Sequence, residues 1–285
     1  MIAPRRHVIV TLSDERCGDF LVEHWAASLQ ANVNLQDVDV VVLDYGLSSR
    51  QREALQAIGV ECYPCVKDGF VGCCCIRDMA KFLSERNYDQ VLHIDGGDVI
   101  FQSDCHSLLS EHCDQFRVVF DEIDTSCHDL LLPSGDLEPG VLDTIHSALR
   151  DKPNINTGLI LAPSPKMIDL CRRSLALLQR LQYIYSDQLA LNYILYQDGF
   201  VHLDGRYNFI PVTTRQKYRI RNGVFLDADD RVIPIVHNAG RYAWARVITR
   251  FGYGPDRNRR KWLIPSLMRA GFLVLDFVKR RVFRR

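Results

Sequence analysis

Apolar runs of strand length alternate with helical patterns along the first part of the chain. The strand-like runs are HVIVTLS (residues 7–13), VDVVVLDYG (38–46), VECYPC (60–65) and QVLHID (90–95). Between them FLVEHWAASLQAN, SSRQREALQAIG and IRDMAKFLSERNY have apolar residues at intervals of three and four. Strands that alternate with helices form a mainly parallel sheet with helices on both faces. The pattern therefore predicts an α/β fold.

The second half repeats this alternation after an interruption. Residues 121–151 are acidic and look irregular, which is typical of either a solvated loop or an excursion beside an acceptor site. A strand (NTGLILA), two helices (KMIDLCRRSLALLQRL and SDQLALNYILY) and a strand (VIPIVHNAG) follow. We expect one domain over residues 1–254 and a separate tail over 255–285.

Composition indicates an ordinary globular protein, with 285 residues, 47% hydrophobic and 25% charged. Ten cysteines could indicate a disulfide framework, but such frameworks belong to short secreted chains. The first twenty residues lack an apolar segment of secretory length, so we expect a cytoplasmic protein. CYPC (62–65) with CCC (73–75) could bind zinc; without a matching second half-site, buried small apolar side chains are the simpler interpretation.

The charge is balanced overall but not along the chain. Residues 256–285 contain ten Lys and Arg against two Asp, while the whole chain has 35 of each sign. On a helical wheel Arg269, Asp276, Arg280 and Arg284 form one stripe, and Leu267, Met268, Val274, Leu275, Val278 and Val282 lie opposite. This predicts a basic amphipathic helix on an anionic membrane surface. A C-terminal helix docked on the domain is the alternative, and no module typical of nucleic-acid binding is visible.

The stretch VLHIDGGDVIF places two carboxylates where a strand ends. Ligands of open α/β sheets gather at the carboxyl ends of strands, and Mg²⁺ or Mn²⁺ binds carboxylates together with phosphate oxygens. Asp95 and Asp98 are therefore candidate metal ligands. Asp and Gly are also the favoured residues of hairpin turns, so this stretch alone leaves both interpretations open.

The order of several motifs makes the chain similar to a known family. HVIVTLSDE, VLHIDGGDVIF, NINTGLILA, SDQLALN and VHNAG, between His7 and Trp244, resemble the GT-A nucleotide-sugar glycosyltransferases. The resemblance is to the retaining group that contains glycogenin and bacterial lipopolysaccharide galactosyltransferases. It implies a glycosyltransferase with a mixed, mainly parallel sheet flanked by helices.

The resemblance also implies a metal site. Asp95 and Asp98 match the aspartates that bind Mn²⁺ or Mg²⁺ and the donor diphosphate, and His237 matches a late histidine ligand. This chain has one residue more between the two aspartates than the family pattern. We expect the extra glycine to form a bulge that keeps both carboxylates on the metal; otherwise Asp98 binds alone. A hydrogen-bonded structural role is the alternative for His237.

Further residues match donor-binding and catalytic positions of the family. Ser13 and Asp14 match the site of the base and ribose, Arg77 approaches the donor phosphate and sugar, Asn156 and Thr157 face the sugar, and Asp187 and Gln188 lie beneath the anomeric carbon. Three of these assignments have an ordinary alternative in this sequence: a helix cap for Asp14, a helix cap by Ser186 or Asp187 at the later helix, and an ion pair with Asp78 or Glu85 for Arg77.

The expected activity is transfer of a hexose from a UDP-linked donor to a glycan or lipid-linked glycan, with retention, at the inner face of a membrane. Two alternatives remain. One is a nucleotide-sugar-binding module with a degraded metal site, favoured by the inserted glycine. The other is a nucleotidyltransferase, which the absence of a glycine-rich triphosphate loop near the first strand disfavours.

Overall fold

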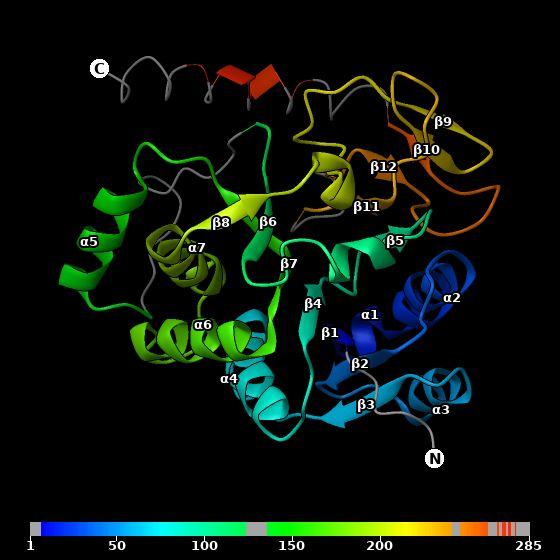
Figure 1. Cartoon of the computed structure of the whole chain (residues 1–285). Coiled ribbons are helices and arrows are strands. Elements are labelled where there is room, and N and C mark those ends of the chain that lie inside the picture. The colour runs from blue at the N-terminus through cyan, green and yellow to red at the C-terminus, as the bar shows by residue number, and fades with distance from the viewer. Residues whose placement is uncertain are drawn as a thin grey trace.

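The computed structural model describes residues 7–123, 136–240 and 246–261, and residues 267, 270, 271, 273, 274 and 277. Its centre is a seven-stranded sheet in the order β3-β2-β1-β4-β7-β6-β8 (Figure 1). The strands are β1 (His7–Ser13), β2 (Val38–Asp44), β3 (Glu61–Pro64), β4 (Gln90–Ile94), β6 (Phe116–Phe120), β7 (Ile155–Pro163) and β8 (Phe200–His202). Strands β1 to β4 are parallel, β7 is antiparallel to β4 and β6, and β8 is parallel to β6. The predicted mixed, mainly parallel sheet is confirmed.

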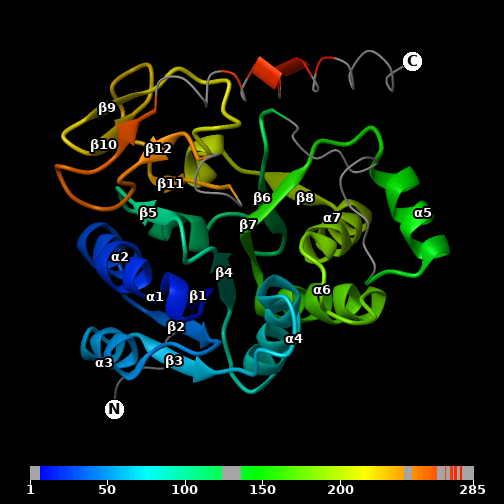
Figure 2. The same cartoon turned by 180° about the vertical axis from the view of Figure 1, so that it is seen from behind.

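Helices cover both faces of this sheet, as Figures 1 and 2 show. They are α1 (Glu15–Phe20), a π-helical turn (Leu21–Ala26) and α2 (Ala27–Asn32) in succession, then α3 (Ser49–Ala57), α4 (Val71–Ser84), α5 (Pro139–Leu149), α6 (Ser164–Leu177) and α7 (Ser186–Asp198). In β1, Val8 and Val10 pack with α4, α6 and α7, whereas Ile9 packs with Trp25 and Leu29 on the opposite face. The alternation of a strand therefore divides the core into two layers.

Three two-stranded sheets lie beyond the carboxyl end of β4 (Figure 1). They pair β5 (Val99–Phe101) with β11 (Ile235–His237), β9 (Arg219–Arg221) with β10 (Val224–Leu226), and β12 (Ile248–Thr249) with β13 (Arg259–Arg260). Two 3₁₀ helices, η2 (His106–Leu109) and η3 (Gly205–Asn208), accompany them. Phe209, Phe225 and Val236 form a third apolar core here. This small core holds β11 against β5.

Two local predictions were wrong. Helix α4 begins at Val71 rather than near Ile76, because Cys73, Cys74 and Cys75 act as apolar residues and are buried in the helix. Part of the segment expected to be irregular is helix α5, with proline in its first turn and with Ile145 and Leu149 buried. Residues 124–135 of that segment lie outside the described residues.

Residues 255–261 pair with the main domain. Asn258 is 3% exposed and donates hydrogen bonds to the carbonyl oxygens of Gly223 and Gly252, while β13 pairs with β12. The start of the expected tail is thus integrated into the fold. Beyond it, the described positions are helical, and the side chains of Leu267, Val274 and Phe277 are exposed. No helix among the described residues is both long and apolar enough to cross a bilayer.

The nine described cysteines carry free thiols. The CYPC and CCC segments form no group of metal-ligating side chains within the described part of the chain. Burial raises the pKa of Cys65 and Cys105, each to about 12, which keeps these thiols neutral. They behave as the small apolar side chains that the sequence suggested.

Candidate active site

Two long-range strand contacts bring the predicted metal ligands together. Asp95 directly follows β4, and Asp98 directly precedes β5. Because β11 pairs antiparallel with β5, His237 lies opposite Val99, next to Asp98. The histidine reaches the two carboxylates only through this pairing.

The three side chains converge on one point. Nε2 of His237 lies 3.5 Å from Oδ2 of Asp95 and 3.2 Å from Oδ1 of Asp98, and one ligand atom from each residue lies within 4.8 Å of the other two. Two carboxylates and an imidazole suit Mn²⁺ or a similar divalent ion, which also accepts phosphate and water. Within the described residues this is the one group of at least three His, Cys, Asp or Glu side chains with such geometry.

The two glycines between the carboxylates form a bend, not a β-bulge. Strands β4 and β5 pair with different partners, so residues 96 and 97 connect two sheets instead of interrupting one ladder. A Cβ atom on Gly96 would lie 2.6 Å from Oγ1 of Thr11 and 2.9 Å from the carbonyl oxygen of Leu12. The bend therefore requires glycine, and it still brings both carboxylates toward His237.

A third glycine makes room for the cluster from the side of β7. A Cβ atom on Gly158 would lie 2.6 Å from Cε1 of His237, 2.7 Å from Oδ2 of Asp95 and 2.9 Å from Oδ1 of Asn156. Real Cβ atoms do not approach other atoms so closely. The glycine of NINTG is therefore a steric requirement of the site.

Asn208 sets the orientation of the histidine. Nδ1 of His237 lies 3.0 Å from Oδ1 of Asn208, which can only accept, so Nδ1 carries the hydrogen and the lone pair of the neutral ring is on Nε2. Nδ2 of Asn208 donates in turn to Oδ1 of Asn156 at 3.0 Å. Both Asn208 and His237 are almost completely buried. The ring is therefore held with its free nitrogen toward the carboxylates, as in metal-binding histidines.

The same network continues to the predicted catalytic residues. Asp121 accepts hydrogen bonds from Asn156 (3.2 Å) and Asn154 (2.6 Å), and Gln188 donates to Oδ1 of Asn154 at 3.0 Å. Asp121, through Asn154, thus links the start of β7 to the start of α7. Sequence reasoning missed Asn154, Asn208 and Asp121; their only signal was a polar residue directly beside an apolar strand.

Asp95 and Asp98 have different charged neighbours. Arg246, also missed from the sequence, donates from Nη2 to Oδ2 of Asp98 at 2.9 Å. Burial alone would raise the pKa of Asp98, but His237 and Arg246 lower it below its ordinary value. Burial raises the pKa of Asp95, which pairs with no arginine among the described residues. Burial alone would lower the pKa of His237, whereas Asp98 and Asp95 raise it. A cation would relieve the unpaired negative charge.

Asp187 faces the same site from α7. It lines a cavity of about 60 Å³ together with Asp95 and Thr157. Burial raises its pKa to about 6, and Oδ1 has no hydrogen-bond partner among the described residues. The capping alternative is not realised, because Tyr185, with a φ of 74°, occupies the N-cap position. The carboxylate is thus available to a ligand.

Ser13 and Asp14 lie where β1 ends, at the same edge of the sheet as Asp95. Asp14 caps α1 by accepting from the backbone N–H of Arg16 at 3.1 Å, and it forms an ion pair with Lys67 at 2.7 Å. The capping alternative is therefore present. A cap leaves the second carboxylate oxygen to a cationic or hydroxyl partner, so donor binding by Asp14 is compatible with it.

Arg77 makes the surface interaction that was its alternative. It donates from Nη1 to both carboxylate oxygens of Asp68 at 2.8 Å and from Nε to Asp78 at 2.9 Å. These partners hold the guanidinium, and Arg77 does not line the cavity beside Asp95. In this arrangement Arg77 has no contact with the site.

No protein-family model matches the sequence, and no curated protein matches it significantly. Solved structures do. A galactosyltransferase LgtC solved with donor and acceptor sugar analogs is 15% identical, with a TM-score of 0.54 over 94% of this chain and 95% of that one. An active-site mutant of LgtC gives 17% identity and a TM-score of 0.54 over 93% and 95% of the two chains. The bifunctional glycosyltransferase WbbM is 14% identical, with a TM-score of 0.55 over 86% of this chain and 47% of that one.

At these identities the likeness establishes the fold. The chain has the GT-A fold that its motif order indicated, with the mixed sheet seen in glycosyltransferases. The similarity to LgtC extends over nearly the whole of both chains.

Proposed function

We propose that this protein is a metal-dependent glycosyltransferase that uses a nucleotide-sugar donor. The observation that carries the proposal is the convergence of Asp95, Asp98 and His237 at the end of β4, beside a cavity shared with Asp187. LgtC, whose fold the chain shares, was solved with donor and acceptor sugar analogs. A ligand-binding edge with a cation site suits a substrate that contains both a diphosphate and a sugar.

The residues present fit a divalent cation, Mn²⁺ or Mg²⁺. Asp95, Asp98 and Nε2 of His237 would hold it, leaving other positions for diphosphate oxygens. When bound, the cation neutralises the charge that develops on the departing nucleoside diphosphate. Arg246, next to Asp98, adds a second positive group at the position of the leaving group.

Asp187, Gln188 and Asn156 would position the donor sugar. The unpartnered carboxylate oxygen of Asp187 accepts a hydrogen bond from the sugar, while the network through Asn154 and Asp121 keeps Gln188 and Asn156 in place. At neutral pH an aspartate with a pKa of about 6 is ionised. It is therefore an acceptor, and transfer with retention would leave the proton of the acceptor hydroxyl to the departing phosphate.

Ser13, Asp14 and Thr157 complete the proposed donor site, with a UDP-linked hexose as the donor. Thr157 lines the cavity directly. Asp14 would bind a ribose or base hydrogen at the end of β1 while it continues to cap α1. Arg77 would have to release both Asp68 and Asp78 to reach the donor, so we assign it no donor contact in this arrangement.

The acceptor is proposed to be a glycan or lipid-linked glycan at the cytoplasmic face of an anionic membrane. The exposed apolar side chains of Leu267, Val274 and Phe277 favour this over a docked C-terminal helix. Truncation after Lys261, which keeps β13, is expected to abolish binding to vesicles of anionic lipid and to preserve donor hydrolysis. Undiminished vesicle binding by the truncated protein would contradict the anchor.

A binding module that does not transfer sugar is the second candidate, favoured by the ion pair between Arg246 and Asp98. The deciding experiment measures UDP release from a panel of UDP-sugars with Mn²⁺ and then with excess chelator. Release from one donor that chelation abolishes supports the transferase. UDP binding without release from any donor, even with glycan acceptors added, supports the binding module.

A further inference from the structure

The cavity beneath Asp95 has an unusual lining for a sugar site. Most of the side chains that surround it are apolar and come from α4, β7, α6 and α7: Cys75, Met79, Ile160, Met167, Cys171 and Leu191. Burial raises the pKa of Cys171 to about 12 and that of Cys75 well above its ordinary value, so both thiols are neutral. These side chains therefore form an apolar chamber whose lining includes four sulfur atoms.

The polar groups of the cavity are few. Asp95 and Thr157 join it to the metal cluster. Oδ1 of Asp187 and Nδ1 of His93 are buried without a hydrogen-bond partner within the described part of the chain. Buried polar atoms of this kind are costly unless a ligand or water satisfies them. An occupant should thus offer hydrogen-bonding groups to these few polar atoms and an apolar group to the rest of the lining.

A plain hexose does not fit this division. Each of its hydroxyl groups needs a partner, and a hydroxyl directed among Met79, Met167 and Cys171 would lose its hydrogen bonds with water and find none in return. An acetamido group has the required pattern. Its N–H can donate to Asp187, its carbonyl oxygen can accept from His93 or Thr157, and its methyl group is apolar.

We propose that the donor sugar is an acetamido-hexose whose methyl group occupies the chamber formed by Cys75, Met79, Met167 and Cys171. This inference rests on the proposed function, because it places the donor sugar between Asp95 and Asp187. It adds the class of donor, which the metal cluster alone does not select.

The test compares matched donors that differ only in this substituent. Affinities of UDP, UDP-N-acetylglucosamine, UDP-glucose, UDP-N-acetylgalactosamine and UDP-galactose for the full chain with Mn²⁺ are measured by calorimetry. At least one acetamido donor is expected to bind about ten-fold more tightly than its plain hexose partner, the discrimination typical of one small apolar group in a fitted pocket. UDP release should show the same preference.

Variants at one position test the chamber itself. Cys171→Leu adds volume to the chamber and is expected to remove most of the ten-fold preference, whereas Cys171→Ala adds none and should keep it. The affinity of UDP, which lacks the transferred sugar, reports whether each variant is folded and retains the nucleotide site. A preference that survives Cys171→Leu in a folded variant would place the acetamido group elsewhere and overturn the assignment.

Failure of the acetamido inference and failure of the proposed function give different results. If UDP binds and a plain hexose donor is preferred or equal, the acetamido inference fails and the transferase proposal stands. A stronger preference for a 6-deoxyhexose nucleotide over both acetamido donors likewise overturns it. If neither UDP nor any donor binds, the proposed function fails and this inference fails with it.

Discussion

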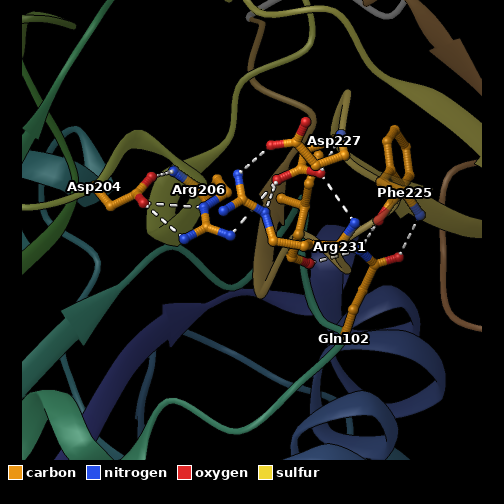
Figure 3. A network of polar contacts seen from close by, with 8 residues as sticks. Gln102, Asp204, Arg206, Phe225, Asp227 and Arg231 are labelled. Carbon is orange, nitrogen blue, oxygen red and sulfur yellow. Dashed lines mark hydrogen bonds and ion pairs between the residues drawn. The ribbon is translucent and has the colours of Figure 1, made fainter.

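Two clusters of carboxylates in this protein differ in how their charge is matched. In the network of Figure 3, Asp204 pairs with Arg206, and Asp227 pairs with Arg231 at 2.8 Å and with Arg206 at 3.6 Å. The side chain of Gln102 accepts a hydrogen bond from the backbone N–H of Phe225 and donates one to its carbonyl oxygen. Both carboxylates of this network have an arginine partner from the protein itself.

The cluster at the end of β4 is matched incompletely. Among the described residues, Asp95, Asp98 and His237 meet with one arginine, Arg246, and Asp187 adds a third carboxylate nearby. The result is raised pKa values for Asp95 and Asp187, which burial causes, and an unpartnered carboxylate oxygen. The difference is the one expected between a structural network and a binding site: under the proposed function, a cation and a substrate would supply the partners that the second cluster lacks.

The largest expected effect is on turnover when a metal ligand is removed. Asp98→Ala should lower Mn²⁺-dependent UDP release by at least about 100-fold, because the leaving diphosphate loses its bound counter-charge. The variant should fold, as judged by circular dichroism and thermal unfolding. Asp204→Ala in the matched network is the control and should keep its turnover. Wild-type activity in Asp98→Ala would remove the metal hypothesis.

A smaller effect, a loss of Mn²⁺ affinity, is expected when the orientation of His237 is disturbed. Asn208→Ala removes the acceptor for Nδ1–H and should weaken Mn²⁺ binding by about 10- to 100-fold. Asn208→Asp restores an acceptor at this position and should recover part of the affinity. The measurement is Mn²⁺ titration by calorimetry. Equal affinities in all three proteins would show that Asn208 does not position the ligand.

A substitution in the matched network is expected to lower stability and to leave activity almost unchanged. Asp227→Ala leaves Arg231 and two backbone N–H groups without their acceptor, so the midpoint of thermal unfolding should fall. UDP release per folded molecule, measured well below that midpoint, should change by less than about two-fold. A large loss of activity in the folded variant would show that the two clusters are coupled.

The smallest effect is a pH dependence of stability from Asp187. Its folded-state pKa of about 6 lies above the ordinary value of 3.8, so the folded state binds the proton more tightly and the buried carboxylate is destabilising at pH 7. This cost disappears as the pH falls below both values. The free energy of unfolding of Asp187→Asn should therefore exceed that of wild type by on the order of 1 kcal/mol at pH 7, and most of this difference should be lost at pH 4.

Urea unfolding at pH 7 and pH 4, with chelator present, measures this difference. Asp204→Asn is the control, because the pKa of Asp204 is lowered by Arg206 even though burial acts in the other direction. Asp204→Asn should therefore lower the free energy of unfolding at pH 7. A pH-independent difference for Asp187→Asn would mean that its carboxyl group is not strained by burial.

Local sequence patterns were sufficient for the first half of the sheet. The alternating apolar runs of β1 and β2 are local, and the start of α3 is determined by a capping box in which Ser48 and Gln51 satisfy each other's backbone. The start of α4 was missed because a run of three cysteines carries no strong signal of either helix or strand. The helix Pro139–Leu149 was missed because the polar residues around it concealed two buried positions, Ile145 and Leu149.

For the site, sequence patterns were enough to name the candidate cation ligands: Asp95 and Asp98 lie beside a buried strand, and a motif resemblance added His237. The pairing of β5 with β11, which brings Nε2 of His237 to 3.2 Å from Asp98, is visible only in the folded chain. So is the ion pair of Arg77 with Asp68. Chemical type and strand ends are local properties, whereas distances between side chains depend on the packing of segments far apart in the chain.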